Sequence, residues 1–182
     1  MTTPAGIWTG PEAMLGAMLS VTTPFQTFCG VATPAAALAR VHYEGLPDPA
    51  DAETGEYTLA ELEAYRPCAI IGAPDRESWS ARRVAEETYR TSGKLLVMFL
   101  RSVSGATHGL PSGDDIVAYK NLVGPVIAKN LASEPDGIMD LPWQSPYLAL
   151  KEAWLVEGPY TNEAEAVQDE GVWIGSTWCL EW

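Results

Sequence analysis

Residues 95–100 read Leu-Leu-Val-Met-Phe-Leu, an unbroken apolar run that leaves little choice of structure. In an extended segment successive side chains point to opposite faces, so this run would be apolar on both of them. A strand with two apolar faces has to be covered on both sides, as the central strand of a sheet is. The sequence therefore predicts a central strand over 94–103.

The residues just before this run are typical of a turn. Thr91-Ser92-Gly93 combines small polar residues with glycine, which favours a tight reversal of the chain. The segment 84–90 would then return alongside 94–100. Composition alone would favour a helix over 78–90, but the turn that follows favours a β-hairpin between these two segments, which is the prediction adopted.

Three further segments predict strands. The short apolar run 68–72 is flanked by prolines and is typical of a buried strand. Near the end of the chain, 146–156 and 171–182 have strand-like patterns and enclose an acidic segment, 157–170. The last two strands would form a C-terminal β-hairpin with an acidic loop.

Helical periodicity predicts a long helix after the glycine-rich segment 105–113. Asp114 and Asp115 suit its first turn, where carboxylates interact favourably with the helix dipole. Pro125 would remove a backbone hydrogen bond and kink this helix near Asn121. The apolar positions repeat with helical spacing: Ile116, Tyr119, Val123, Val126, Ile127 and Leu131.

The segment 11–40 is predicted to be helical, beginning with an apolar stripe over Met14–Leu19. The next segment, 44–57, combines proline, glycine and five acidic residues, which predicts an exposed acidic loop. Thr58 and Glu61 then have the spacing of a capping box at the start of a short helix.

Length and composition indicate one folded domain over 1–182. The chain has 182 residues and 47% of them are apolar, which is ordinary for a globular protein. The predicted fold class is α+β: a small mixed or antiparallel sheet with a long kinked helix packed on one face and a C-terminal β-hairpin.

Charge excludes two classes of ligand. With 24 acidic and 11 basic residues the net charge is -13, which argues against tight binding of nucleic acid or of an anionic membrane surface. The charge is uneven: 1–75 carries -7, 76–101 carries +3 and 102–182 carries -9. The basic segment is either a solvated face or a contact patch for an acidic surface, including one on another copy of this chain.

No segment predicts a catalytic site. His108 with Ser104 or Ser112 lacks a nucleophile-elbow motif, and the acidic residues of 48–56 lack the spacing of an EF-hand. The residues 72–75 follow a strand, yet lack the lysine and the glycine spacing of phosphate-binding loops. The sequence predicts no cofactor and no metal.

The cysteine spacing predicts no zinc site, and the uncharged N-terminal region predicts no membrane-spanning helix. Cys29, Cys68 and Cys179 have no CxxC spacing and are expected to be reduced, buried thiols in a cytosolic environment. The uncharged stretch 13–39 contains prolines, glycines and threonines, so it holds no apolar helix of membrane-spanning length.

Tryptophan is concentrated near the end of the chain, with five of the seven in the last forty residues. Core packing explains most of these indoles, but alternation along the last strand places Trp173 on the opposite face from Trp178 and Trp182. Both faces therefore carry indoles, which makes one of them a candidate for a subunit interface. The candidate interface residues are Arg76, Arg82, Arg83, Arg90, Trp154, Trp173, Trp178 and Trp182.

The element order and apolar patterning resemble the tail terminator (tail completion) proteins of long-tailed bacteriophages. The segments that carry the resemblance are Met14–Leu19, Arg66–Ile71, Ser92–Phe99, Tyr119–Ile127 and Trp173–Trp182. The resemblance covers the first helix and then the chain from about Arg66 to its end.

This resemblance implies an α+β subunit of a hexameric ring that caps the tail tube and joins it to the head. It implies no active site, a bore through which DNA passes without specific binding, and contacts with the tail-tube protein and a head or neck connector. The protein would be made in the host cytoplasm and end in the virion. Another neck connector, a tail-tube subunit and a small α+β enzyme remain alternatives.

Overall fold

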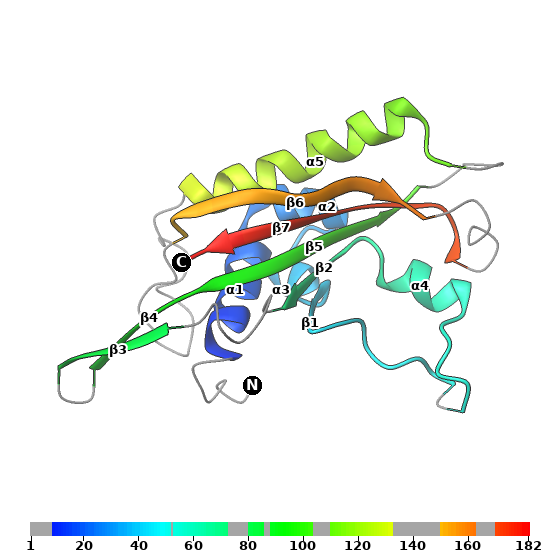
Figure 1. Cartoon of the computed structure of the whole chain (residues 1–182). Helices are drawn as coiled ribbons and strands as arrows, with labels where there is room; N and C mark the ends of the chain where they lie inside the picture. Colours follow the sequence, from blue (N-terminus) through cyan, green and yellow to red (C-terminus); the bar gives the residue numbers. More distant parts are fainter. Residues whose placement is uncertain are drawn as a thin grey trace.

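The chain folds around a five-stranded mixed sheet in the computed structural model (Figure 1). The structure describes residues 9–51, 53–72, 80–85, 88–103, 110–132, 150–162 and 170–182. The main sheet has the order β1-β2-β5-β7-β6, in which β1 is parallel to β2 and every other neighbouring pair is antiparallel. Its strands are β1 (Val41–Tyr43), β2 (Cys68–Gly72), β5 (Lys94–Ser102), β7 (Trp173–Glu181) and β6 (Glu152–Thr161).

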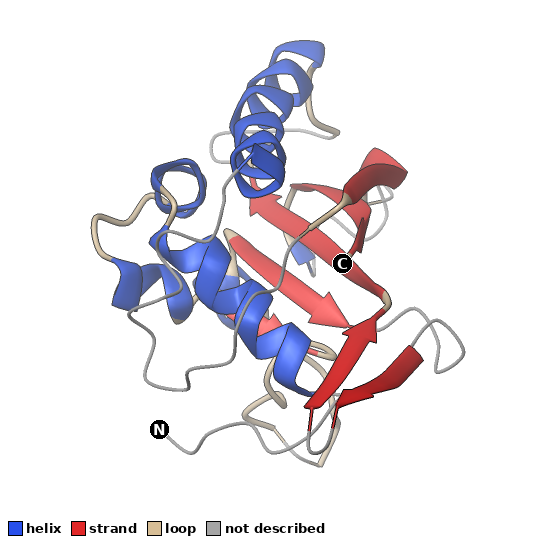
Figure 2. Cartoon of the chain, turned by 90° about the vertical axis from the view of Figure 1, so that its left-hand side faces the viewer, coloured by secondary structure: helices blue, strands red, loops and turns tan. Residues whose placement is uncertain are grey.

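Helices cover one face of this sheet, which confirms the α+β class. Figure 2 shows the helical layer on one side of the strands, and the short fourth helix lies near one end of the sheet in Figure 1. The described helices are α1 (Thr9–Val21), α2 (Thr23–Cys29), α3 (Pro34–Leu38), α4 (Leu59–Tyr65) and α5 (Gly113–Ala132).

The core lies between the central strand β5 and the helical layer. Leu95, Val97 and Phe99 alternate toward the helices and are fully buried. The ring of Phe99 meets that of Phe28 from α2 edge-on at 5.7 Å between centroids, and the Tyr119 hydroxyl of α5 donates to the Phe99 carbonyl oxygen at 2.9 Å. The central strand predicted from the apolar run is therefore confirmed, with β2 on one side and β7 on the other.

The predicted hairpin between 84–90 and 94–100 is wrong. Instead β3 (Ser80–Ala85) pairs with β4 (Thr88–Ser92), and β4 leads through Gly93 into β5. Gly93 is no turn residue: its amide donates to the Trp182 carbonyl, and Trp182 donates back to the Gly93 carbonyl. Both edges of β5 are already occupied by β2 and β7, so 84–90 has no place beside it.

The last two strands are present with shifted bounds. The strand predicted over 146–156 is observed as β6 at Glu152–Thr161, and residues 146–149 lie outside the described part. β6 runs through Pro159, which an edge strand tolerates because one of its sides needs no backbone donor. The short strand β1 had no counterpart among the expected strands.

Local helix signals are confirmed. Thr58 and Glu61 form the capping box of α4: the Thr58 amide donates to Glu61 Oε2 at 2.8 Å and the Glu61 amide to Thr58 Oγ1 at 3.3 Å. α2 ends at Gly30, whose φ of 67° lies in the left-handed region that glycine adopts without strain. α5 includes Pro125 in its interior, and the kink there stays a prediction.

Candidate subunit interface

The strands β3 and β4 form an arm that extends beyond one end of the main sheet (Figure 1). Among the described strands they pair only with each other, and the arm is joined to the body through β5. The register sets Arg82 directly opposite Arg90, so these two residues share one face of the arm. Arg83 stands opposite Tyr89 and belongs to the other face.

The opposite end of the molecule is acidic. Residues 41–65, which include β1, the acidic loop and α4, contain seven acidic residues and no lysine or arginine. We call this segment the acidic end, and in Figure 1 its loop and α4 lie at the other end of the sheet from the arm. Its exposed carboxylates belong to Glu44, Asp48, Asp51, Glu53, Glu56 and Glu63.

Hydrogen bonds tie the acidic loop to α4. The amide of Ala50 donates to Glu61 Oε1 at 2.7 Å, and the Tyr57 hydroxyl donates to the Pro47 carbonyl at 2.8 Å. The Glu53 amide donates to Asp51 Oδ1 at 2.9 Å, which together with a hydrogen bond from the Thr54 amide lowers the pKa of Asp51. These hydrogen bonds fix the conformation of the loop, and the lowered pKa keeps Asp51 ionised at neutral pH.

Two of the candidate tryptophans lie on the sheet face opposite the helical layer. Trp154 of β6 and Trp173 of β7 share this face by strand register and are half-buried. Lys94 Nζ lies 5.1 Å from the centre of the Trp154 ring, and Arg66 Cζ lies 5.5 Å from that of Trp173. Each indole is therefore already in contact with a cation of its own chain.

Arg66 is a contributor that the sequence argument did not single out. Its guanidinium is buried, stacks on Trp173 and donates from Nη1 to the Glu170 carbonyl at 2.7 Å. It thereby connects the end of α4 to the start of β7. The sequence feature that could have pointed to Arg66 is its position as a single arginine in an otherwise acidic stretch.

The other two tryptophans face the helical layer. Trp182 is 5% exposed and packs in the core, so it has no surface left for an interface. Trp178 is half-buried and lines an apolar cavity of about 270 Å³ between α5 and β6, together with Val123 and Leu155. The face assignment of Trp173 against Trp178 and Trp182 agrees with the strand register.

Three of the four arginine candidates lie on the arm. Arg82, Arg83 and Arg90 are placed together by the arm, whereas Arg76 lies outside the described residues. The structure thus gathers three arginines at one end and two indoles on one sheet face, and it does not join these two groups into one patch.

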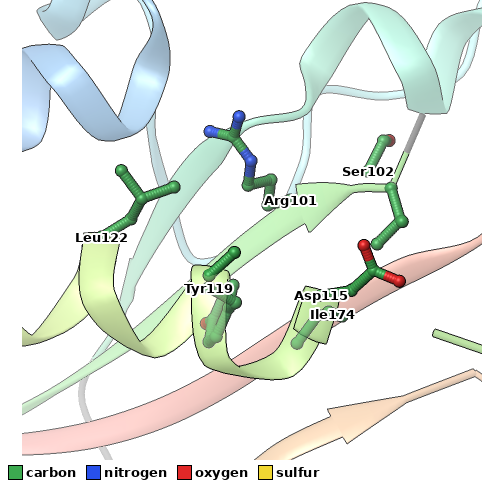
Figure 3. Close-up of a pocket in the computed structure, with 8 residues that line it drawn as sticks. Arg101, Ser102, Asp115, Tyr119, Leu122 and Ile174 are labelled. Carbon is green, nitrogen blue, oxygen red and sulfur yellow. The ribbon is translucent and has the colours of Figure 1, made fainter. Parts of the chain in front are cut away.

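A second cavity, of about 200 Å³, lies where β5 ends and α5 begins (Figure 3). Arg101, Asp115 and Tyr119 have hydrogen-bond partners, whereas the buried Ser102 hydroxyl has none among the described residues. Arg101 extends away from Asp115, and its Nη1 donates to the Phe28 carbonyl at 2.6 Å. Asp115 Oδ2 accepts from the Ser112 hydroxyl and amide at 2.6 and 2.9 Å and so caps α5. No acid–base pair faces this cavity among the lining residues described.

The remaining chemical candidates are placed as follows. Ser112 caps α5, while Ser104 and His108 lie outside the described residues. Within the described ranges no three His, Cys, Asp or Glu residues gather as a metal site, and no described helix is long and apolar enough to cross a membrane. The cysteines are free and buried, and burial raises the pKa of Cys29 and Cys68 to about 12.

The arrangement is therefore that of a surface with two charged ends. Comparison with protein-family models and with curated protein sequences finds no match to this chain.

Proposed function

We propose that this chain is a structural virion protein of a long-tailed bacteriophage, a tail terminator or head–tail joining subunit that assembles into a homo-oligomeric ring. The observation that carries the proposal is the separation of a basic arm and an acidic end to opposite ends of one subunit. Unlike surfaces at opposite ends favour head-to-tail contacts, and such contacts make a ring when the rotation between neighbours closes.

The fold supports this proposal. An α+β subunit with a mixed sheet and one helical layer is what the resemblance to tail terminators implies. The finer features, a long helix kinked at Pro125 and a C-terminal hairpin made by β6 and β7, belong to the proposal as well. In this role the subunit performs no chemistry. It ends the growth of the tail tube and matches the tube to the neck.

The charge of the chain suits a ring with a DNA path through its centre. A net charge of -13 repels the phosphate backbone, so DNA would pass without being held. The partners in this proposal are further copies of the chain in a hexameric ring, the tail-tube protein on one side and a head or neck connector on the other.

Negative-stain electron microscopy of the purified chain tests the proposal. Closed rings of uniform diameter are the expected result, with a sixfold class average. Open tubes would instead indicate a tail-tube subunit, and single compact particles at high protein concentration would favour a small enzyme. Antibody labelling of intact virions would then show whether the chain lies at the joint between head and tail.

A further inference from the structure

We infer that the β3–β4 arm binds the acidic end of a second copy of this chain through the face that carries Arg82 and Arg90. This inference rests on the ring proposed above and names the two surfaces that would meet in it. Three observations carry it: the isolation of the arm, the opposition of two arginines within it, and the position of the acidic end.

Within the part of the chain that the structure describes, no third strand supports the two strands of the arm. Hairpins of two strands are at best marginally stable in water, and a third strand or a packed helix is required for independent stability. Among the described elements, β3 and β4 pair with no third strand. A surface from outside this chain would supply the missing support.

The arm also contains a cross-strand pair that is unfavourable within one copy. Arg82 and Arg90 occupy directly opposite positions, and like charges at such positions destabilise a strand pair. An anion bound across both residues reverses that effect. Guanidinium groups bind carboxylates in a forked geometry, so a carboxylate-rich surface is a matched partner for this face.

The acidic end supplies such a surface on the other side of the molecule. Glu53 and Glu56 are exposed, and neither carboxylate accepts a hydrogen bond from another described residue. Their loop is held in place by the bond from Ala50 to Glu61. Since the arm and the acidic end lie at opposite ends of the body, the arm of one copy meets the acidic end of another (Figures 1 and 2).

A protein partner suits this arm better than DNA does. The strands of the arm carry three arginines, whereas the chain as a whole carries -13 and two glutamates follow directly after Ala85. Duplex DNA would meet the repulsion of the whole subunit and only a few favourable contacts. A second copy offers seven acidic residues in one segment.

Two single substitutions give a matched test by sedimentation velocity. Arg82→Glu and Arg83→Glu change the charge equally in the same strand and act on opposite faces of the arm. We expect Arg82→Glu to weaken self-association by about tenfold or more and Arg83→Glu to change it by less than about twofold. Arg82→Glu replaces a like-charge pair with an opposite-charge pair, so unfolding of the arm does not explain a loss.

Complementary charge reversals test the identity of the two surfaces. Arg82→Glu/Arg90→Glu alone and Glu53→Lys/Glu56→Lys alone should each fail to assemble. An equimolar mixture of the two variants should assemble, because every arm then has an oppositely charged end available. If the mixture stays dissociated, or if Arg82→Glu associates as the unchanged protein does, the inference is overturned.

The outcomes separate this inference from the proposed function. Closed rings that persist in Arg82→Glu overturn the inference and leave the ring intact. Open chains or dimers that the mixture restores support the inference and contradict the ring. A fluorescent DNA duplex of random sequence tests the other kind of partner. If the unchanged protein binds this duplex, and Arg82→Glu abolishes that binding without changing self-association, the arm is a DNA contact and the inference is overturned.

Discussion

At the scale of single residues, Glu12 is a buried carboxyl group whose surroundings raise its pKa. It lies on α1, is 6% exposed, and is beside Glu44, which directly follows β1. Burial raises the pKa of Glu12 to about 7, with further contributions from a hydrogen bond and charge repulsion with Glu44. The contact between Glu12 and Glu44 connects the first helix to the edge of the sheet.

This pair predicts a stability that falls as the pH rises. Between the ordinary pKa of 4.5 and the folded value of about 7, the folded state holds a proton that the unfolded state has lost. The stabilisation from Glu12 is therefore complete below pH 4.5 and is lost as the pH rises through 7. Glu12→Gln keeps the hydrogen-bonding capacity and cannot ionise.

Urea unfolding at pH 5 and pH 8 measures the effect. We expect Glu12→Gln to be more stable than the unchanged protein at pH 8, by an amount on the order of 2 kcal/mol. The difference between the two proteins should shrink at pH 5. A difference that is the same at both pH values would show that Glu12 does not titrate in this range.

Gly175 shows how closely the aromatic side chains approach the sheet. A Cβ atom there would lie 2.8 Å from Leu100 Cδ2 and 3.0 Å from Tyr160 Cε2. Gly175→Ala should therefore push Tyr160 away from the strand and destabilise the fold by about 1–3 kcal/mol. Thermal unfolding monitored by circular dichroism measures this cost. Gly113→Ala is the matched control, because an added Cβ there meets no heavy atom within 4 Å beyond its chain neighbours and the backbone of its own helix.

At the scale of elements, the capping box of α4 holds the acidic end together. Glu61 accepts from both Thr58 and Ala50, so it fixes the start of a seven-residue helix and the preceding loop at once. Thr58→Ala should cost about 1 kcal/mol in the free energy of unfolding. Hydrogen exchange should rise at Leu62 and Arg66, whose amides close the turns of this helix. Thr58→Ser retains the hydroxyl and should restore both values.

Local signals let the sequence predict the elements whose causes are themselves local. The capping box, the glycine end of α2 and the doubly apolar strand β5 all depend on a few neighbouring residues. The pairing of 84–90 depended on which strands compete for the edges of β5. That competition is settled by β2 and β7, which come from distant parts of the chain.

The same distinction between local and long-range causes applies to the candidate interface. The basic segment and the acidic loop follow from counting charges, and the sequence predicts both. The opposition of Arg82 and Arg90 follows from the true hairpin register, so the wrong hairpin concealed it. The burial of Trp182 also escaped prediction, because alternation assigns a strand face and does not say how deeply that face is packed.

At the scale of the whole molecule, the edges of the main sheet are poorly suited to joining subunits. β6 carries Glu152, Glu157 and Pro159 and has two irregularities in its register. Charges, prolines and bulges on an edge strand oppose pairing with another chain. The other edge, β1, has three residues. Continuation of the sheet between copies is therefore disfavoured, and contacts through the arm remain available.

An assembly held by the arm and the acidic end has a characteristic response to salt. Charges at a surface are screened over about 10 Å at 0.1 M ionic strength, and the distance shortens as the salt concentration rises. We expect self-association to weaken by about tenfold or more between 50 and 500 mM sodium chloride, measured by light scattering. Apolar contacts are unchanged or strengthened by salt. Self-association that stays constant or increases over this range would therefore contradict a charged interface. Glu53→Lys/Glu56→Lys serves as the control, because it lacks the attraction and should remain unassembled at both 50 and 500 mM sodium chloride. The salt response thus decides whether charge or apolar burial joins the subunits.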